Sequence, residues 1–196
     1  GLAGVELLVD EWAADVTYSG TQKCLSAPPG ISLITFSDKA AARVQSRNTP
    51  VQSWFLDLSL LMAYWQGEGA RTYHHTAPVN AMYGLHEALL MVKEEGIENA
   101  WQRHRDMHGL LAEGVRSLGL DFVVAAECRL PQLNLVRCPE GLDEAAVRRR
   151  LLEEYNLEIG AGLGAFTGKV WRIGLMGYSA RRENVELCIS ALRSCI

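Results

Sequence analysis

The residue best suited to covalent chemistry is Lys23, which follows a short β-like run at 16–18 and a stretch of small polar residues. Soon after it the chain enters Pro28-Pro29-Gly30, a turn that neither a helix nor a strand can continue. A lysine held at a strand end and screened from water loses its proton more easily than a surface lysine, which makes Lys23 a candidate imine-forming nucleophile. A solvated lysine at a loop edge is the alternative, because most lysines are exposed.

Three segments of the chain resemble one enzyme family in their order and approximate spacing. They are Ser19-Gly20-Thr21-Gln22-Lys23 with Pro28-Pro29-Gly30, Tyr73-His74-His75-Thr76-Ala77-Pro78, and Gly162-Leu163-Gly164 through Gly168-Lys169-Val170-Trp171-Arg172-Ile173-Gly174. They are similar to segments of the pyridoxal-phosphate-dependent alanine–glyoxylate and serine–pyruvate aminotransferases, which belong to class V of fold type I. The resemblance covers nearly the whole chain. It implies an α/β fold in which residues 1–96 are the C-terminal part of the large cofactor-binding domain and residues 97–196 form a small α/β C-terminal domain.

The resemblance also implies roles for individual residues. Lys23 would be the catalytic lysine, which binds pyridoxal 5′-phosphate and later moves a proton between the substrate α-carbon and the cofactor. Gln22 would contact the cofactor within the subunit, whereas Tyr73 and Thr76 would reach across the interface of a homodimer to the neighbour's cofactor phosphate. Arg172 would bind the substrate α-carboxylate, because a guanidinium matches a carboxylate with two hydrogen bonds.

The implied reaction transfers an amino group from alanine or serine to glyoxylate or pyruvate. Related class V enzymes, such as a hydroxykynurenine transaminase or a lyase, stay open because Arg172 suits them all. A catalytically inert truncated chain is a third interpretation. The segment from Leu2 to Trp12 resembles the part just after the family's cofactor-binding aspartate, so Asp10 is not expected to be that aspartate and the chain is expected to belong to a longer enzyme.

Composition excludes several other functions. A net charge of −4 and a pI near 5.8 give no electrostatic footprint for nucleic acid or an anionic membrane. The sequence contains neither an apolar stretch long enough for a membrane span nor a signal-peptide pattern, which predicts a cytoplasmic protein. Five cysteines without a Cys-x-x-Cys pair indicate reduced thiols rather than a disulfide framework or a zinc site.

Histidine and glycine motifs elsewhere are better explained as structural. His104 and His108 share a helix face, but no third ligand is near in sequence, so core or surface histidines are favoured over a metal site. His74 and His75 are adjacent and could not both face one ligand from a strand, so they too are interpreted as structural. The glycine-rich run at 160–165 fits a dinucleotide-binding pattern, but it leads towards a strand rather than opening a helix.

The apolar periodicity predicts alternating strands and helices. In the first half we expect a buried strand at 31–36, a helix capped at Ser37-Asp38, an apolar helical segment at 54–65 ending at 67–69, and a helix from Val79 closed by Gly96. A long helix at 97–118 should follow. Beyond it we expect strands at 122–124, 133–136, 157–159 and 170–176, with helices at 143–155 and from 180, as an antiparallel or mixed sheet covered by helices.

Overall fold

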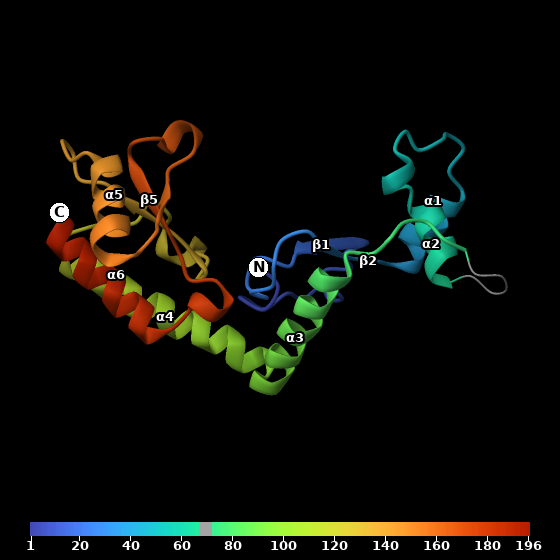
Figure 1. Ribbon diagram of the computed structural model, residues 1–196, viewed down its shortest axis with the longest axis horizontal. Helices are drawn as coiled ribbons and strands as arrows, with labels where there is room; N and C mark the ends of the chain where they lie inside the picture. The colour runs from blue at the N-terminus through green and yellow to red at the C-terminus, as the bar shows by residue number, and fades with distance from the viewer. Residues whose placement is uncertain (67–71) are drawn as a thin grey trace.

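The computed structural model describes residues 1–66 and 72–196. The molecule is elongated, with a two-stranded hairpin and the N-terminus in the middle (Figure 1). A small domain that contains the C-terminus lies at one end, and an arm that contains α1 and α2 lies at the other. Helices α3 and α4 meet at an angle below the hairpin and connect the two ends.

The hairpin consists of β1 (Val16–Gly20) and β2 (Ser32–Phe36), which pair antiparallel so that Gly20 lies opposite Ser32. The strand at 31–36 was predicted to be buried, and this prediction was wrong: Ile34 is 39% exposed, and every residue of the strand is exposed or half-buried. The reason is that the sheet has only two strands, so no neighbouring layer among the described residues covers both of its faces. Residues 21–28, which we call the lysine turn, leave β1 directly after Gly20.

The arm, residues 37–78, follows β2. It contains α1 (Asp38–Gln45), the short 3₁₀ helix η1 (Trp54–Leu56) and α2 (Leu58–Gln66). The predicted cap of α1 is confirmed, because the Ser37 hydroxyl accepts a hydrogen bond from the Ala40 N–H at 3.2 Å. The predicted end of the apolar segment at 67–69 lies outside the described residues.

Two consecutive long helices confirm the sequence prediction for the middle of the chain. Helix α3 (Val79–Glu95) ends at Gly96, and α4 (Ile97–Ser117) begins directly after it. Gly96 has φ +84°, a conformation that favours glycine and allows the two helix axes to diverge.

The small domain packs three helices on a three-stranded antiparallel sheet of order β3-β5-β4, which confirms the expected architecture. Two strand predictions were wrong in detail. Within 122–124 only Phe122 pairs with another strand, through a single bridge to Val136, and the strand predicted at 157–159 begins at Gly160. Besides α4, the domain consists of β3 (Leu133–Arg137), α5 (Glu144–Tyr155), β4 (Gly160–Ala161), the 3₁₀ turn η3 (Gly164–Phe166), β5 (Val170–Gly174) and α6 (Arg182–Cys195).

Buried apolar side chains form two clusters. The larger draws on α4, α5, α6 and the sheet, and its fully buried members include Trp171, Leu111 and Leu151. The smaller contains Ala3, Cys24 and Leu25, with Leu85 and Met176 packed against it. The larger cluster lies wholly beyond residue 96, which agrees with the division into 1–96 and 97–196; that division stays a prediction.

Candidate active site

The backbone of the lysine turn is closed by a buried threonine. Thr21 is fully buried, and its hydroxyl donates to the Pro28 carbonyl at 2.8 Å and to the Ile31 carbonyl at 3.3 Å. Two backbone bonds complete the turn, from the Ala27 N–H to the Thr21 carbonyl and from the Ser26 N–H to the Lys23 carbonyl. The sequence prediction that the turn fixes the position of Lys23 therefore has a physical basis in these bonds.

The side chain of Lys23 is exposed, whereas Cys24 and Leu25 beside it are buried. The turn thus presents the amine outward while its neighbours anchor the backbone. The described residues do not provide the screening from water that was expected for an imine-forming lysine. Gln22 is also exposed, and its side chain folds back over Gly20, where an added Cβ would lie 2.5 Å from the Gln22 Oε1.

The lysine turn docks on the loop that follows β5. The Tyr178 N–H donates to the Ser26 hydroxyl at 2.8 Å. Gly177 has φ +56°, and a Cβ there would lie 2.5 Å from the Cys24 carbonyl oxygen and closer still to the Ser26 hydroxyl. Only glycine fits such a close backbone approach, so residues 177–178 join the lysine turn to the small domain.

Helix α4 also binds the loop that follows β5, through the side chain of Arg103. Arg103 Nη1 donates to the carbonyls of Gly177 at 2.7 Å and Ala180 at 3.2 Å. Its Nε and Nη2 bind both carboxylate oxygens of Glu95, at 2.5 and 2.9 Å, which fixes the guanidinium plane. This ion pair lowers the pKa of the Glu95 carboxyl, chiefly through the hydrogen bonds from Arg103.

His104 is a core histidine, as the sequence favoured, and is fully buried. Its Nε2 accepts a hydrogen bond from the Gly177 N–H at 2.9 Å, so the proton of the neutral ring lies on Nδ1, which donates to the Ala100 carbonyl at 2.6 Å. Burial lowers the pKa of His104, and the nearby Arg103 charge acts in the same direction. The ring is therefore held neutral in one tautomer.

Arg172 lies on β5 beside the fully buried Trp171. Its side chain crosses Gly160 on the neighbouring strand, and its Nε donates to the Ala161 carbonyl at 2.6 Å. Within residues 1–66 and 72–196, no hydrogen bond engages the two terminal nitrogens of this guanidinium. They are free for a ligand carboxylate, which is the role implied by the resemblance. Gly177 comes five residues after Arg172, so the backbones of the two residues are at most about 18 Å apart.

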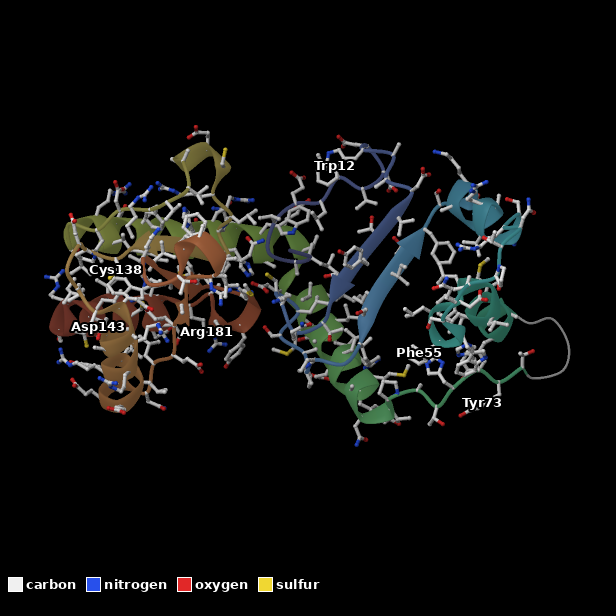
Figure 2. All side chains as sticks on the ribbon, turned by 90° about the horizontal axis from the view of Figure 1, so that it is seen from above. Trp12, Phe55, Tyr73, Cys138, Asp143 and Arg181 are labelled. Atoms are coloured by element: carbon white, nitrogen blue, oxygen red, sulfur yellow. The ribbon has the colours of Figure 1, made fainter. Side chains whose placement is uncertain are left out.

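Tyr73 and Thr76 lie away from Lys23 in the same chain. Both are exposed, and their hydroxyl oxygens are 2.6 Å apart. The arm leaves the hairpin at Phe36, which pairs with Val16, whereas the lysine turn leaves at the opposite end, about 14 Å along the strand. Figure 2 shows Tyr73 beside Phe55 on the arm, across the hairpin from Arg181 of the small domain. One chain thus does not assemble the five predicted site residues.

A structural role was predicted for His74 and His75, and the packing of His74 agrees with it, but the reason given for the prediction does not hold. His74 is buried, and its ring stacks on Trp54 with centroids 4.0 Å apart. The prediction assumed a strand, from which adjacent histidines could not both face one ligand. This assumption was wrong, because the segment is not a strand and the two Nδ1 atoms lie 2.7 Å apart. Among the residues that the structure describes, no three histidine, cysteine or acidic side chains converge as metal ligands.

Sequence reasoning missed the contacts made by Glu95, Arg103, His104 and Gly177. A signal was present only for Gly177, which follows the arginine-bearing strand in a Gly-Tyr-Ser turn. The partners of Arg103 and His104 in the loop after β5 lie more than seventy residues further along the chain. Local sequence patterns do not predict contacts between residues so far apart in the chain.

Comparison with known proteins places this arrangement in a family. The model of the family described as aminotransferase class-V matches residues 2–187. The chain belongs to the class-V aminotransferase family. In the part of the chain that the structure describes, no helix combines the length and the apolarity needed to cross a bilayer.

Several relatives resemble the chain along its whole length. It is 44% identical to the alanine–glyoxylate aminotransferase of Rattus norvegicus and 36% identical to the (S)-ureidoglycine–glyoxylate transaminase of Bacillus subtilis (strain 168), in both cases over 100% of this chain. These alignments cover 48% and 51% of the relatives. A crystal structure of the alanine–glyoxylate aminotransferase from Nostoc sp. is 46% identical, has a TM-score of 0.95 and matches 100% of this chain with 51% of its own. The chain therefore spans about half the length of these proteins, and its fold is that of class-V aminotransferases.

Proposed function

We propose that this chain is the lysine-bearing C-terminal part of a pyridoxal-phosphate-dependent aminotransferase that transfers the amino group of alanine to glyoxylate. The observation that carries the proposal is the lysine turn, which anchors its backbone through Thr21 and Ser26 and leaves the Lys23 amine exposed. A primary amine held on a rigid turn can bind an aldehyde and then act as a base at a fixed place.

The donor groups suit pyridoxal phosphate chemically. The aldehyde requires a primary amine, which Lys23 supplies, and the phosphate oxygens require donors, which Gln22, Tyr73 and Thr76 supply. The hydroxyls of Tyr73 and Thr76 are 2.6 Å apart on an exposed segment, so both are able to face one phosphate of another subunit. The cofactor, when bound, supplies the electron sink that amino-group transfer needs. A homodimer is part of the proposal, because the arm lies across the hairpin from the lysine turn of its own chain.

The chain's own residues then have separate tasks. Lys23 would accept the proton from the substrate α-carbon and pass it to the cofactor, rather than back to the same carbon. Arg172 orients the substrate by binding its α-carboxylate with the two terminal nitrogens, because Nε is already engaged by the Ala161 carbonyl. Hydrogen bonds to charged groups contribute roughly 1.5–3 kcal/mol each, enough to select amino acids over simple amines.

The names of the relatives support glyoxylate as the acceptor, since it is common to the rat, Nostoc and Bacillus proteins. Alanine is the proposed donor because the rat relative, whose name contains alanine, is more similar to this chain, at 44% against 36% identity. Ureidoglycine is the second candidate donor, supported by the Bacillus relative.

The test is covalent trapping in the full-length protein. We expect borohydride treatment after incubation with pyridoxal phosphate to fix the cofactor on the peptide that contains Lys23, and not on Lys39, an exposed lysine paired with Asp15 at 2.6 Å. Amino-donor half-reactions with alanine, serine and ureidoglycine should then be fastest with alanine, and glyoxylate should regenerate the starting form faster than pyruvate. A stable protein that fixes no cofactor, or fixes it equally on Lys39, would overturn the proposal and favour an inert chain.

A further inference from the structure

Two consecutive residues of α4 hold both backbone groups of one glycine. His104 Nε2 accepts from the Gly177 N–H at 2.9 Å, and Arg103 Nη1 donates to the Gly177 carbonyl at 2.7 Å. Arg103 is itself fixed by two bonds to Glu95 at the end of α3. The position of Gly177 is thereby determined from the buried side of the molecule, since His104 is fully buried.

The same glycine determines where the lysine turn lies. No Cβ fits between Gly177 and the Cys24 carbonyl, and the next residue, Tyr178, donates its N–H to the Ser26 hydroxyl. Ser26 has φ +57° and donates its own N–H to the Lys23 carbonyl at 2.9 Å. A continuous series of hydrogen bonds and close backbone contacts therefore runs from the His104 ring to Lys23.

We propose that His104 is a positioning residue for Lys23: its unprotonated Nε2, acting through Gly177 and Tyr178, fixes the lysine turn against the domain that carries Arg172. The proposal concerns geometry, and only its kinetic consequence rests on the proposed function. Aminotransferase chemistry would need both ends of one substrate, the amine near Lys23 and the carboxylate near Arg172, to be held in a fixed relation.

The protonation state of His104 decides whether this arrangement is stable. An imidazolium has two N–H donors, so its Nε2–H would face the Gly177 N–H and the bond between them would be lost. The charged groups that act on the ring are Glu95 from α3 and Arg103 from α4. The titratable group that the lysine turn contributes to this contact is the Cys24 thiol, which lies against Gly177 and Arg103. Burial lowers the pKa of His104 more than Glu95 raises it, which keeps the acceptor available near neutral pH.

Three variants of the full-length protein separate positioning from general stability. H104Q retains an acceptor near the place of Nε2, whereas H104M has a similar length and no strong acceptor. H108M is the matched control, because His108 lies one turn further along α4 and contacts Asn134 at 2.8 Å rather than the loop at 177–178. Hydrogen exchange of peptides that cover residues 21–28 needs neither cofactor nor activity.

We expect H104M to reduce protection of residues 21–28 by at least about tenfold, the effect of one lost hydrogen bond of typical strength, while H104Q and H108M stay close to the original protein. In the original protein this protection should fall as the pH drops through the pKa of His104, and in H104Q it should not. For turnover measured per cofactor-bound Lys23, kcat should fall at least about tenfold in H104M with a smaller change in the KM for alanine, and H104Q should restore it.

Unchanged protection at 21–28 in H104M would overturn the inference, as would an equal loss in H108M, since that would indicate general destabilisation. If H104M does not fold, the pH dependence of protection in H104Q against the original protein decides the question, and equal dependence overturns the inference. Failure of the proposed function looks different: the original protein would fix no cofactor on Lys23, while exchange at 21–28 would still respond to H104M.

Discussion

The lysine turn and the segment 73–76 are both expected at the cofactor, yet the chain holds them in different ways. The lysine turn is closed by the buried Thr21 and docked on the small domain through Ser26. Tyr73 is 61% exposed, and its hydroxyl pairs only with Thr76 among the described residues. One part of the predicted site is therefore preformed by its own chain, while the other is presented outward, as a segment serving another subunit would be.

The apolar side chains follow the same contrast. Around the small domain they form a core with fully buried members such as Trp171 and Leu192. On the arm, Trp54 and Phe55 are each 56% exposed and Trp65 is 54% exposed. A concentration of exposed aromatic side chains is typical of a surface that packs against another chain, which agrees with the proposed dimer.

The largest effect is expected at the lysine itself. Replacing Lys23 with arginine keeps a cation but removes the only primary amine of the turn, and so its only imine-forming group, because guanidinium does not deprotonate in proteins. We expect complete loss of cofactor trapping and of turnover, with an unchanged free energy of unfolding because the side chain is exposed. Absorbance of the bound cofactor and urea unfolding measure these two quantities. Residual trapping in K23R would remove Lys23 from its role.

The next largest effect is expected at Gly177, whose close contact with Cys24 holds the lysine turn against the small domain. Gly177→Ala adds strain of about 1–2 kcal/mol at a positive φ and an overlap with the Cys24 carbonyl that costs about 1–3 kcal/mol. We expect the free energy of unfolding to fall by roughly 2–5 kcal/mol in urea titrations. Gly174→Ala is the control, since nothing lies within 4 Å of an added Cβ there. Equal losses in the two variants would show that residues 177–178 are not a tight contact.

Removing one hydroxyl from the lysine turn and one from the segment 73–76 compares how much each region contributes to stability. Thr21→Val removes a fully buried hydroxyl and its bonds to the Pro28 and Ile31 carbonyls, each typically worth about 0.5–1.5 kcal/mol, so we expect a loss of about 1–3 kcal/mol in the free energy of unfolding. Thr76→Val removes an exposed hydroxyl and should change stability by less than about 0.5 kcal/mol. Chemical denaturation of both variants compares the regions directly, and a larger loss in T76V would reverse the contrast.

The smallest effect is expected from pH. The folded-state pKa of His104 lies below its usual value of 6.5, so the unfolded chain binds more protons at low pH. The contribution of His104 to stability is therefore fully present above pH 6.5 and is lost as the pH falls through the folded-state pKa. Between pH 8 and pH 5 the urea midpoint should fall further in the original protein than in H104Q. H104Q is the control because it keeps Glu95 and lacks only the titrating histidine. Parallel declines would mean that His104 does not titrate in this way.

The sequence predicted the features whose cause is local. Ser37 and Gly96 mark helix ends by side-chain and backbone chemistry within a few residues, and the Pro-Pro-Gly run marks the lysine turn. The exposure of β2 was not predicted because it depends on which strands lie beside it. The bonds of Arg103 and His104 to Gly177 were not predictable for a related reason: they join residues that come together only when α4 packs against the loop after β5. The roles of Gln22, Tyr73, Thr76 and Arg172 come from family resemblance and stay predictions.

Mixing two inactive variants tests whether each active site is built from two chains. K23R lacks the lysine but keeps an intact arm, and Thr76→Asp keeps the lysine but sets a carboxylate against the cofactor phosphate of the neighbouring subunit. If each site combines the lysine turn of one chain with the arm of another, half of the subunit pairs in an equal mixture are mixed, and each mixed pair contains one intact site. We predict recovery of about a quarter of the original activity. Activity no higher than the average of the two variants alone would contradict a site shared between two subunits.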